Sequence, residues 1–316
     1  MSPEDQLHRL LDQAVEDVEP GYGLDRIRAR TTHRPRRGWA WGAGGAALAA
    51  AATVAVVVAL NGGSAKTPEP GPAASGTSGE SGRVVYFVGD TGVGPRLVPE
   101  LHDAVSAEAT LDETVAEAVA GRATDPDYTT LWPSGTTMER AQLEAGVLTV
   151  DLSGAVVERP AGMSRATAAL ALQQLVWSAQ AATDSQVPVT FLVDGRPTAT
   201  LLGESTKRPV EASAADEVLA PVSVLAPGES STVRSPFTVE GTASAFEATV
   251  QWELTDADGG AVKRGFATAK ECCTVSPYAF EVTAPPGDYT LVVHDEDVSG
   301  GEGNPESEDT KRVSVR

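Results

Sequence analysis

Cysteine is almost absent from this chain of 316 residues, which holds only Cys272 and Cys273. Two adjacent cysteines cannot connect distant segments, so no disulfide framework holds the fold together. Lipoprotein attachment is excluded as well, because it needs a cysteine directly after an N-terminal apolar run. Thiols outside a membrane tend to be oxidised. A vicinal disulfide, an intermolecular bridge and two reduced thiols under a loop all stay open for this pair.

Positive charge is also scarce, with 24 Lys and Arg against 44 Asp and Glu and a net charge of −20. Residues 1–37 contain seven of each sign, so the remainder carries the whole excess. Affinity for nucleic acid comes largely from Lys and Arg that neutralise phosphates. We therefore expect no nucleic-acid partner, and the solubility of an exported protein explains the acidic surface.

Residues typical of catalysis are few. After residue 60 the only histidines are His102 and His294, and the chain has no GxSxG elbow, HExxH motif or Walker loop. His102 is expected to form a surface pair with Asp103 on a segment of helical character. We predict no enzyme activity, no cofactor and no metal site.

Two acidic stretches are candidates for cation sites, since Ca²⁺ prefers several oxygen ligands. The run from His294 to Asp297 matches no known ligand spacing, which favours a solvated loop. The stretch from Asp256 to Gly259 resembles the start of an EF-hand but lacks the distal Glu. A hairpin turn is favoured there.

A single long uncharged run extends from Trp39 to Leu60. A helix of about 20 apolar residues can cross a membrane. Arginines 26, 28, 30, 34, 36 and 37 precede the run, and such an excess marks the cytoplasmic side. We predict a cytoplasmic stub at 1–38, a transmembrane helix at 39–60 and an extracytoplasmic remainder. A cleaved signal peptide is the alternative, but the leader and the apolar run are both too long for one.

Residues 61–82 are rich in Gly, Ser and Pro and are predicted to be a disordered linker. The block 83–205 then mixes helix and strand signals. Strands are expected at 84–88, 147–152 and 189–193, with a return at 200–202. A helix should begin at a capping box of Thr110 and Glu113, and a second should run from Ser164 to about Ala182. This order predicts an α+β domain with helices on a small mixed sheet.

After a linker at 206–220, the pattern becomes all-β over 221–316. Apolar residues alternate around 222–224, 237–239, 248–254, 266–268, 280–282, 289–293 and 313–315, with turn residues between them. About seven short strands without a helix predict an immunoglobulin-like β-sandwich. Residues 295–309 are expected to form a long acidic loop.

Two stretches resemble known families. The run from Ser235 to Ala243 (SPFTVEGTA), followed by Phe246-Glu247-Ala248, resembles the Gmad2 family, immunoglobulin-like domains of bacterial spore-germination proteins. The preceding block is similar to the GerMN domain of sporulation and germination proteins. Its matching pieces are VYFV at 85–88, WPSGT at 132–136, VDLS at 150–153 and LQQLV at 172–176. The resemblance implies envelope proteins without an established catalytic residue.

Together these observations predict a single-pass membrane protein that displays both domains outside the cell. We expect binding or assembly in the envelope, with envelope proteins or other copies of itself as partners, while any small-molecule ligand stays unknown. Self-association rests on the resemblance alone. The alternatives are an accessory of a cell-wall enzyme and a transmembrane signalling element whose stub binds a cytosolic partner.

Overall fold

The computed structural model describes residues 82–107, 110–154, 157–295 and 306–316, all of which lie within the same structural unit. The predicted stub, transmembrane helix and nearly all of the predicted linker lie outside the described residues. Among the residues described, no helix is long and apolar enough to cross a membrane.

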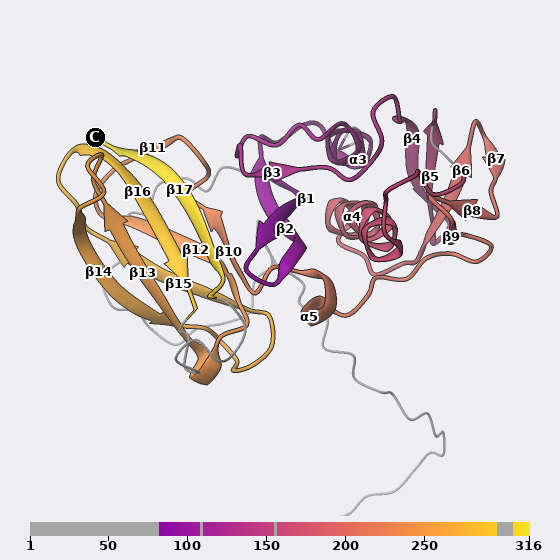
Figure 1. Cartoon of the computed structure of the whole chain (residues 1–316). Coiled ribbons are helices and arrows are strands. Elements are labelled where there is room, and N and C mark those ends of the chain that lie inside the picture. The colour runs from indigo at the N-terminus through magenta and orange to yellow at the C-terminus, as the bar shows by residue number, and fades with distance from the viewer. Residues whose placement is uncertain (1–81, 108–109, 155–156, 296–305) are drawn as a thin grey trace, which may run out of the picture. The chain divides into compact units, whose positions relative to one another are not determined.

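The first domain contains the elements that precede residue 220 (Figure 1). Its strands are β1 (Arg83–Thr91), β2 (Gly94–His102), β3 (Tyr128–Thr129), β4 (Thr137–Glu144), β5 (Val147–Ser153), β6 (Val189–Val193), β7 (Arg196–Pro197), β8 (Thr200–Leu201) and β9 (Glu204–Ser205). Its helices are α3 (Thr110–Ala120), α4 (Arg165–Thr183) and the short α5 (Ala215–Val218).

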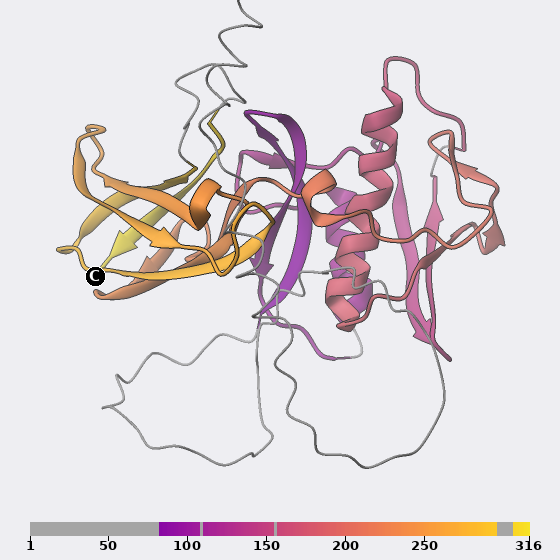
Figure 2. The same cartoon turned by 90° about the horizontal axis from the view of Figure 1, so that it is seen from below.

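Two sheets enclose the long helices of this domain. The antiparallel sheet has the order β2-β1-β3, and the mixed sheet has the order β4-β5-β6-β7, with β5 and β6 parallel. Figure 2 shows α4 between β1 and β2 on one side and β4 to β6 on the other. The predicted small mixed sheet is present as β4-β5-β6-β7, but the helices also pack against a second, antiparallel sheet that the sequence analysis did not predict. Strands β2 and β4 were missed because neither shows a clear apolar alternation.

The apolar residues predicted for α3 and α4 form the core. Val115, Ala118 and Val119 of α3 are buried, as are Leu172 and Leu175 of α4. They meet Val85 and Phe87 of β1 and the inward side chains of β5 and β6. A stripe with helical period thus packs against strand faces with a period of two.

The predicted starts of the two helices differ in outcome. Ser164 caps α4, because its hydroxyl oxygen accepts the amide of Thr167 at 3.0 Å. The capping box at Thr110 is wrong. Thr110 is already helical, and its hydroxyl donates instead to the carbonyl of Ser106 at 3.0 Å.

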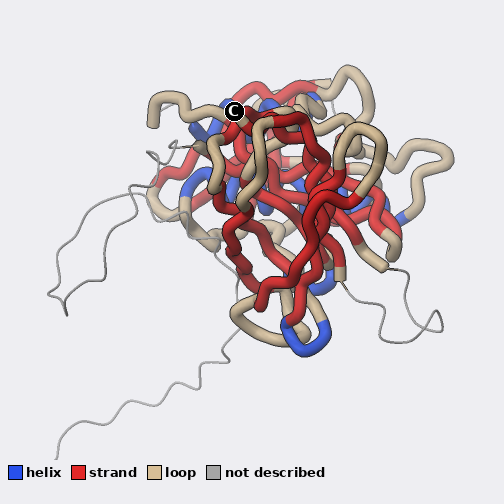
Figure 3. Tube along the Cα trace, turned by 90° about the vertical axis from the view of Figure 1, so that its left-hand side faces the viewer, coloured by secondary structure: helices blue, strands red, loops and turns tan. Residues whose placement is uncertain are grey.

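The second domain is a sandwich of two sheets, and Figure 3, with strands in red, shows how strands dominate it. Its strands are β10 (Val222–Ala226), β11 (Ser231–Val233), β12 (Phe237–Ala243), β13 (Thr249–Thr255), β14 (Ala261–Thr268), β15 (Ser276–Val282), β16 (Gly287–His294) and β17 (Glu308–Val315). A single 3₁₀ turn, η1 (Phe246–Ala248), precedes β13. One sheet has the order β10-β12-β15, and the other β11-β17-β16-β13-β14.

The immunoglobulin-like prediction agrees with this sandwich, although β11 was missed because it is only three residues long. The turn at Asp256 is the expected hairpin, since its carboxylate accepts the amides of Asp258 and Gly260. The predicted loop 295–309 extends too far at its C-terminal end, because β17 already begins at Glu308. Asp309 lies on β17 and is buried.

The motif that begins at Ser235 has a clear packing role. Phe237, Val239 and Ala243 of β12 point into the core. Gly241 shares their face, where a Cβ would lie 2.0 Å from the carbonyl oxygen of Ser223. Glycine is required at this position because the neighbouring strand approaches too closely for a side chain.

Candidate functional site: the junction of the two domains

An apolar cluster connects the two domains. Its buried residues are Val84, Tyr86, Val88, Leu97, Trp177, Val218, Leu219, Leu225 and Val275. Only Leu225 and Val275 come from the second domain. The segment after β9 takes part directly, because the amide of Ala220 donates to the carbonyl of Leu97 at 2.8 Å. The C-terminal end of the predicted linker 206–220 is therefore packed against the first domain.

Two glutamines of the LQQLV stretch on α4 form side-chain hydrogen bonds with backbone groups of other segments. Gln174 is fully buried and donates to the carbonyls of Tyr86 (3.1 Å) and Ala118 (2.9 Å). Gln173 donates to the carbonyl of Glu211 and accepts the amide of Ser213. Buried polar groups must find partners, so this pair joins β1, α3 and the segment 206–220 to one helix.

A buried charged group lies where the last strand of the second domain meets the first domain. The Nζ atom of Lys311 lies 2.7 Å from Asp125 Oδ2 and 2.9 Å from Asp309 Oδ1. The Tyr128 hydroxyl donates to both oxygens of Asp309, at 2.8 and 2.9 Å. All four side chains are nearly inaccessible to solvent. This Lys311 cluster joins Asp125 and Tyr128 of the first domain to β17.

The Lys311 cluster also covers an edge of the sandwich. Asp309 Oδ2 accepts the amide of Val224 on β10 at 2.6 Å. Burial raises the pKa of Asp309, and Lys311 only partly offsets that rise. Burial alone would lower the pKa of Lys311, but Asp309 and Asp125 outweigh it, so this pKa is raised. The ammonium therefore stays charged at neutral pH.

A second ion-pair group continues from the Lys311 cluster through the first domain. The carboxylate of Glu100 accepts the amide of Asp125 at 2.8 Å. His102 Nε2 lies 2.7 Å from Glu100 Oε2, and its Nδ1 lies 2.7 Å from Glu117 Oε2. Arg83 pairs with the other oxygen of Glu117 at 2.7 Å. The expected pair of His102 with the next residue on a helical segment is wrong, because His102 ends strand β2 and contacts these glutamates instead.

The stretch from His294 to Asp297, for which the sequence favours a solvated loop over a cation site, is only partly described, since residues 296–297 lie outside the described residues. His294 forms an ion pair with Glu306, and the carboxylate of Asp295 accepts the amide of Ser307 at 2.7 Å. In the described segments, no group of three or more His, Cys, Asp or Glu side chains is arranged to hold a metal ion.

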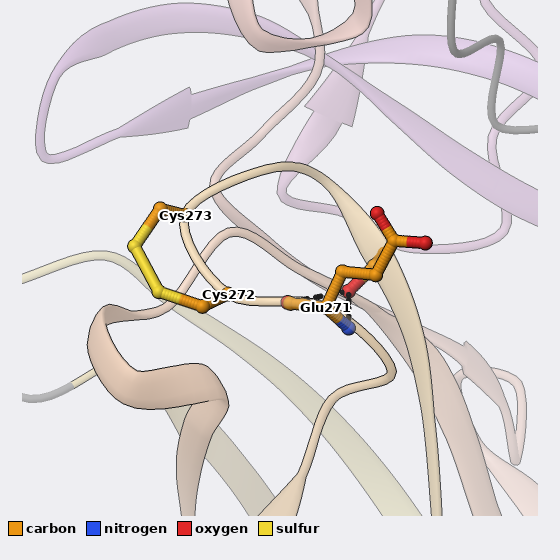
Figure 4. Close-up of a disulfide and its surroundings, with 4 residues drawn as sticks. Glu271, Cys272 and Cys273 are labelled. Carbon is orange, nitrogen blue, oxygen red and sulfur yellow. Dashed lines mark hydrogen bonds between the residues drawn. A yellow bond between two sulfur atoms is a disulfide. The ribbon is translucent and has the colours of Figure 1, made fainter. Parts of the chain in front are cut away.

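The cysteine pair lies in the loop between β14 and β15 (Figure 4). In the structure a disulfide joins Cys272 to Cys273, and both residues are exposed. The loop is closed by the Ser276 hydroxyl, which accepts the amide and donates to the carbonyl of Glu271. The amide of Cys273 donates to the carbonyl of Ala245.

Sequence reasoning missed the Lys311 cluster. A signal was present, because Asp309, Lys311, Val313 and Val315 alternate with outward residues on one strand. The period of two places the charged pair on the same buried face as the valines. The partner Asp125 lies 186 residues away and gives no local signal.

The arrangement defines a class: a mixed helix and sheet domain joined firmly to an immunoglobulin-like sandwich. Residues 84–199 match the Germane family model, described as sporulation and spore germination. Residues 221–302 match the Gmad2 model, described as an immunoglobulin-like domain of bacterial spore germination. The chain therefore carries a GerMN (Germane) domain followed by a Gmad2 domain, as the motifs indicated.

Solved structures are similar at low identity. The first GerMN domain of the sporulation protein GerM from Bacillus subtilis matches at 12% identity, covering 41% of this chain and 96% of that one, with a TM-score of 0.33. The tandem GerMN domains of the same protein match at 11% identity, covering 64% and 62%, also with a TM-score of 0.33. A putative lipoprotein from Clostridium perfringens matches at 16% identity, covering 44% and 93%, with a TM-score of 0.30. No curated protein matches the chain.

Proposed function

We propose that this protein is a membrane-anchored binding or assembly protein of the bacterial cell envelope, with a non-catalytic role. The sequence run 39–60 would anchor it with the N-terminus in the cytoplasm. The GerMN and Gmad2 domains would then act outside the cell on envelope proteins or on other copies of the chain.

The junction is the observation that supports this role best. Buried charge that is paired across two domains fixes one arrangement of them, because an unpaired charge there would be costly. A fixed arrangement presents one constant surface, which a binding module needs and which a hinged enzyme cleft does not. The buried charged groups described above are all paired, those of the Lys311 cluster across the two domains and the others within the first domain.

Topology and role need separate tests. Protease added to intact spheroplasts should remove the C-terminal domains and leave a reporter fused before residue 1 undigested; the reverse pattern would contradict the orientation. For the role, crosslinking in cells from the exterior domains should capture defined envelope proteins or the chain itself. Release of fragments from purified peptidoglycan by the full chain, abolished by one carboxylate substitution, would instead establish an enzyme.

A further inference from the structure

Strand β14 is an open edge of the five-stranded sheet. It pairs with β13 on one side, and within the described residues no strand pairs with its other side. Figure 1 places β14 at the margin of the sandwich, far from β17. Of its eight residues only Ala267 is buried. An exposed row of backbone amides and carbonyls can accept an extended peptide as an added strand.

The other long edges of the sandwich are less available. At β10 the amide of Val224 is already bound to Asp309. At β15 the edge contains Pro277, which lacks an amide donor, and its carbonyl accepts the amide of Lys270. A proline on an edge strand blocks regular pairing. β14 has neither protection.

The outward face of β14 carries an apolar anchor. Val262, Arg264 and Phe266 alternate on this face, and Phe266 is 74% exposed. On the opposite face, Gly265 lies against the ring of Trp252, where a Cβ would come within 2.7 Å. Gly265 thus lets β14 pack closely on Trp252, while the side chain of Phe266 projects into solvent. Val262 and Phe266 together give the open edge a small exposed apolar patch that an added strand would cover.

Charge selects the kind of partner. Residues 221–316 contain 7 Lys and Arg against 16 Asp and Glu, yet Lys263 and Arg264 are consecutive on β14. Arg264 is paired only loosely, with Glu253 at 3.4 Å, and Lys263 donates to the carbonyl of Thr283. A second copy that paired through its own β14 would bring like charges together, which is destabilising.

We propose that β14 binds an extended acidic segment of a partner protein by strand addition. Carboxylates of the segment would lie along Lys263 and Arg264, and an apolar residue would cover Phe266. The proposal rests on the binding role proposed above and names the chemistry of the partner.

The test uses the full chain and two synthetic peptides as long as β14. Both place valine opposite Phe266, and the positions opposite Lys263 and Arg264 are glutamate in one peptide and lysine in the other. Fluorescence anisotropy should show binding of the acidic peptide only. Hydrogen exchange followed by mass spectrometry should show slower exchange of the amides in 261–268 upon binding. Failure of both peptides to bind up to about 1 mM would overturn the proposal.

Variants distinguish binding at the edge of β14 from non-specific attraction between the peptide and the protein. Arg264→Glu and Phe266→Ser should each weaken the acidic peptide about tenfold. The matched controls are Arg140→Glu, on the edge strand β4 and similarly exposed, and Phe246→Ser, 57% exposed but outside β14. Both control variants should bind the acidic peptide with an affinity within about twofold of that of the unmodified chain.

Equal loss in the controls, or protection outside 261–268, would refute strand addition at β14. Dimerisation that depends on Phe266 would assign the edge to a second copy instead and overturn the proposed partner. The spheroplast experiment reads the topology independently, so its failure and the failure of this proposal are distinguishable.

Discussion

Replacing Lys311 with methionine is the strongest test of the junction. The substitution keeps an unbranched side chain but leaves Asp125 and Asp309 buried without their cation. At about 3 Å and an effective dielectric constant of about 20, each ion pair amounts to about 5 kcal/mol of Coulomb attraction. Removal of the ammonium also removes its own desolvation penalty, which offsets much of this. Breaking a buried pair from one side costs about 3–5 kcal/mol.

We therefore expect Lys311→Met to lower the free energy of unfolding of the full chain by about 3–5 kcal/mol at pH 7.5. Urea unfolding followed by far-UV circular dichroism measures this, with the slope checked for a change in cooperativity. Arg264→Met is the matched control, because its pair with Glu253 is exposed to solvent. That control should change stability by no more than about 1 kcal/mol.

The pH dependence provides a second readout for the same variant. Burial raises the pKa of Asp309, so the folded state binds this proton more tightly than the unfolded state does. Stability from such a group is present below its unfolded pKa, about 3.8, and is lost as pH rises through the higher folded value. Without Lys311 the folded pKa should rise further. The deficit of the variant should therefore shrink as pH falls from 7.5 toward 4. A loss like that of the control, or a deficit independent of pH, would refute the buried-charge argument.

Three further predictions concern two single positions and the cysteine pair. Gly241→Ala should lower the melting temperature through a clash costing about 1–3 kcal/mol, whereas Gly228→Ala, which meets nothing within 4 Å, should barely change it; equal shifts would contradict the close approach. Gln174→Leu should lower the free energy of unfolding, measured in urea, by about 3 kcal/mol, because it leaves the buried carbonyls of Tyr86 and Ala118 without a donor. An unchanged free energy would mean that water replaces the amide. Alkylation without reductant should leave Cys272 and Cys273 unmodified by mass spectrometry, and two adducts per chain would remove the disulfide.

The sequence by itself was sufficient for the elements with strong periodicity. The helix after Ser164 and the alternating strands around Phe237 and Trp252 are found where their patterns predicted them. Such patterns are local, since each apolar residue reports its own burial. The short motifs that indicated the two domain families are local as well. A closely packed position such as Gly241 admits few residue types, so it can be recognised from the sequence.

Tertiary structure decided whatever depends on residues far apart in the chain. The two sheets around α4 arise from strand pairing, which β2 and β4 do not reveal in their side chains. The Lys311 cluster joins residues 186 positions apart, and a lysine seen alone is expected to be exposed. Its burial is favourable only because Asp125 and Asp309 are brought to it by the fold. Propensity and periodicity act over a few residues, whereas buried charge is compensated only by partners that folding assembles.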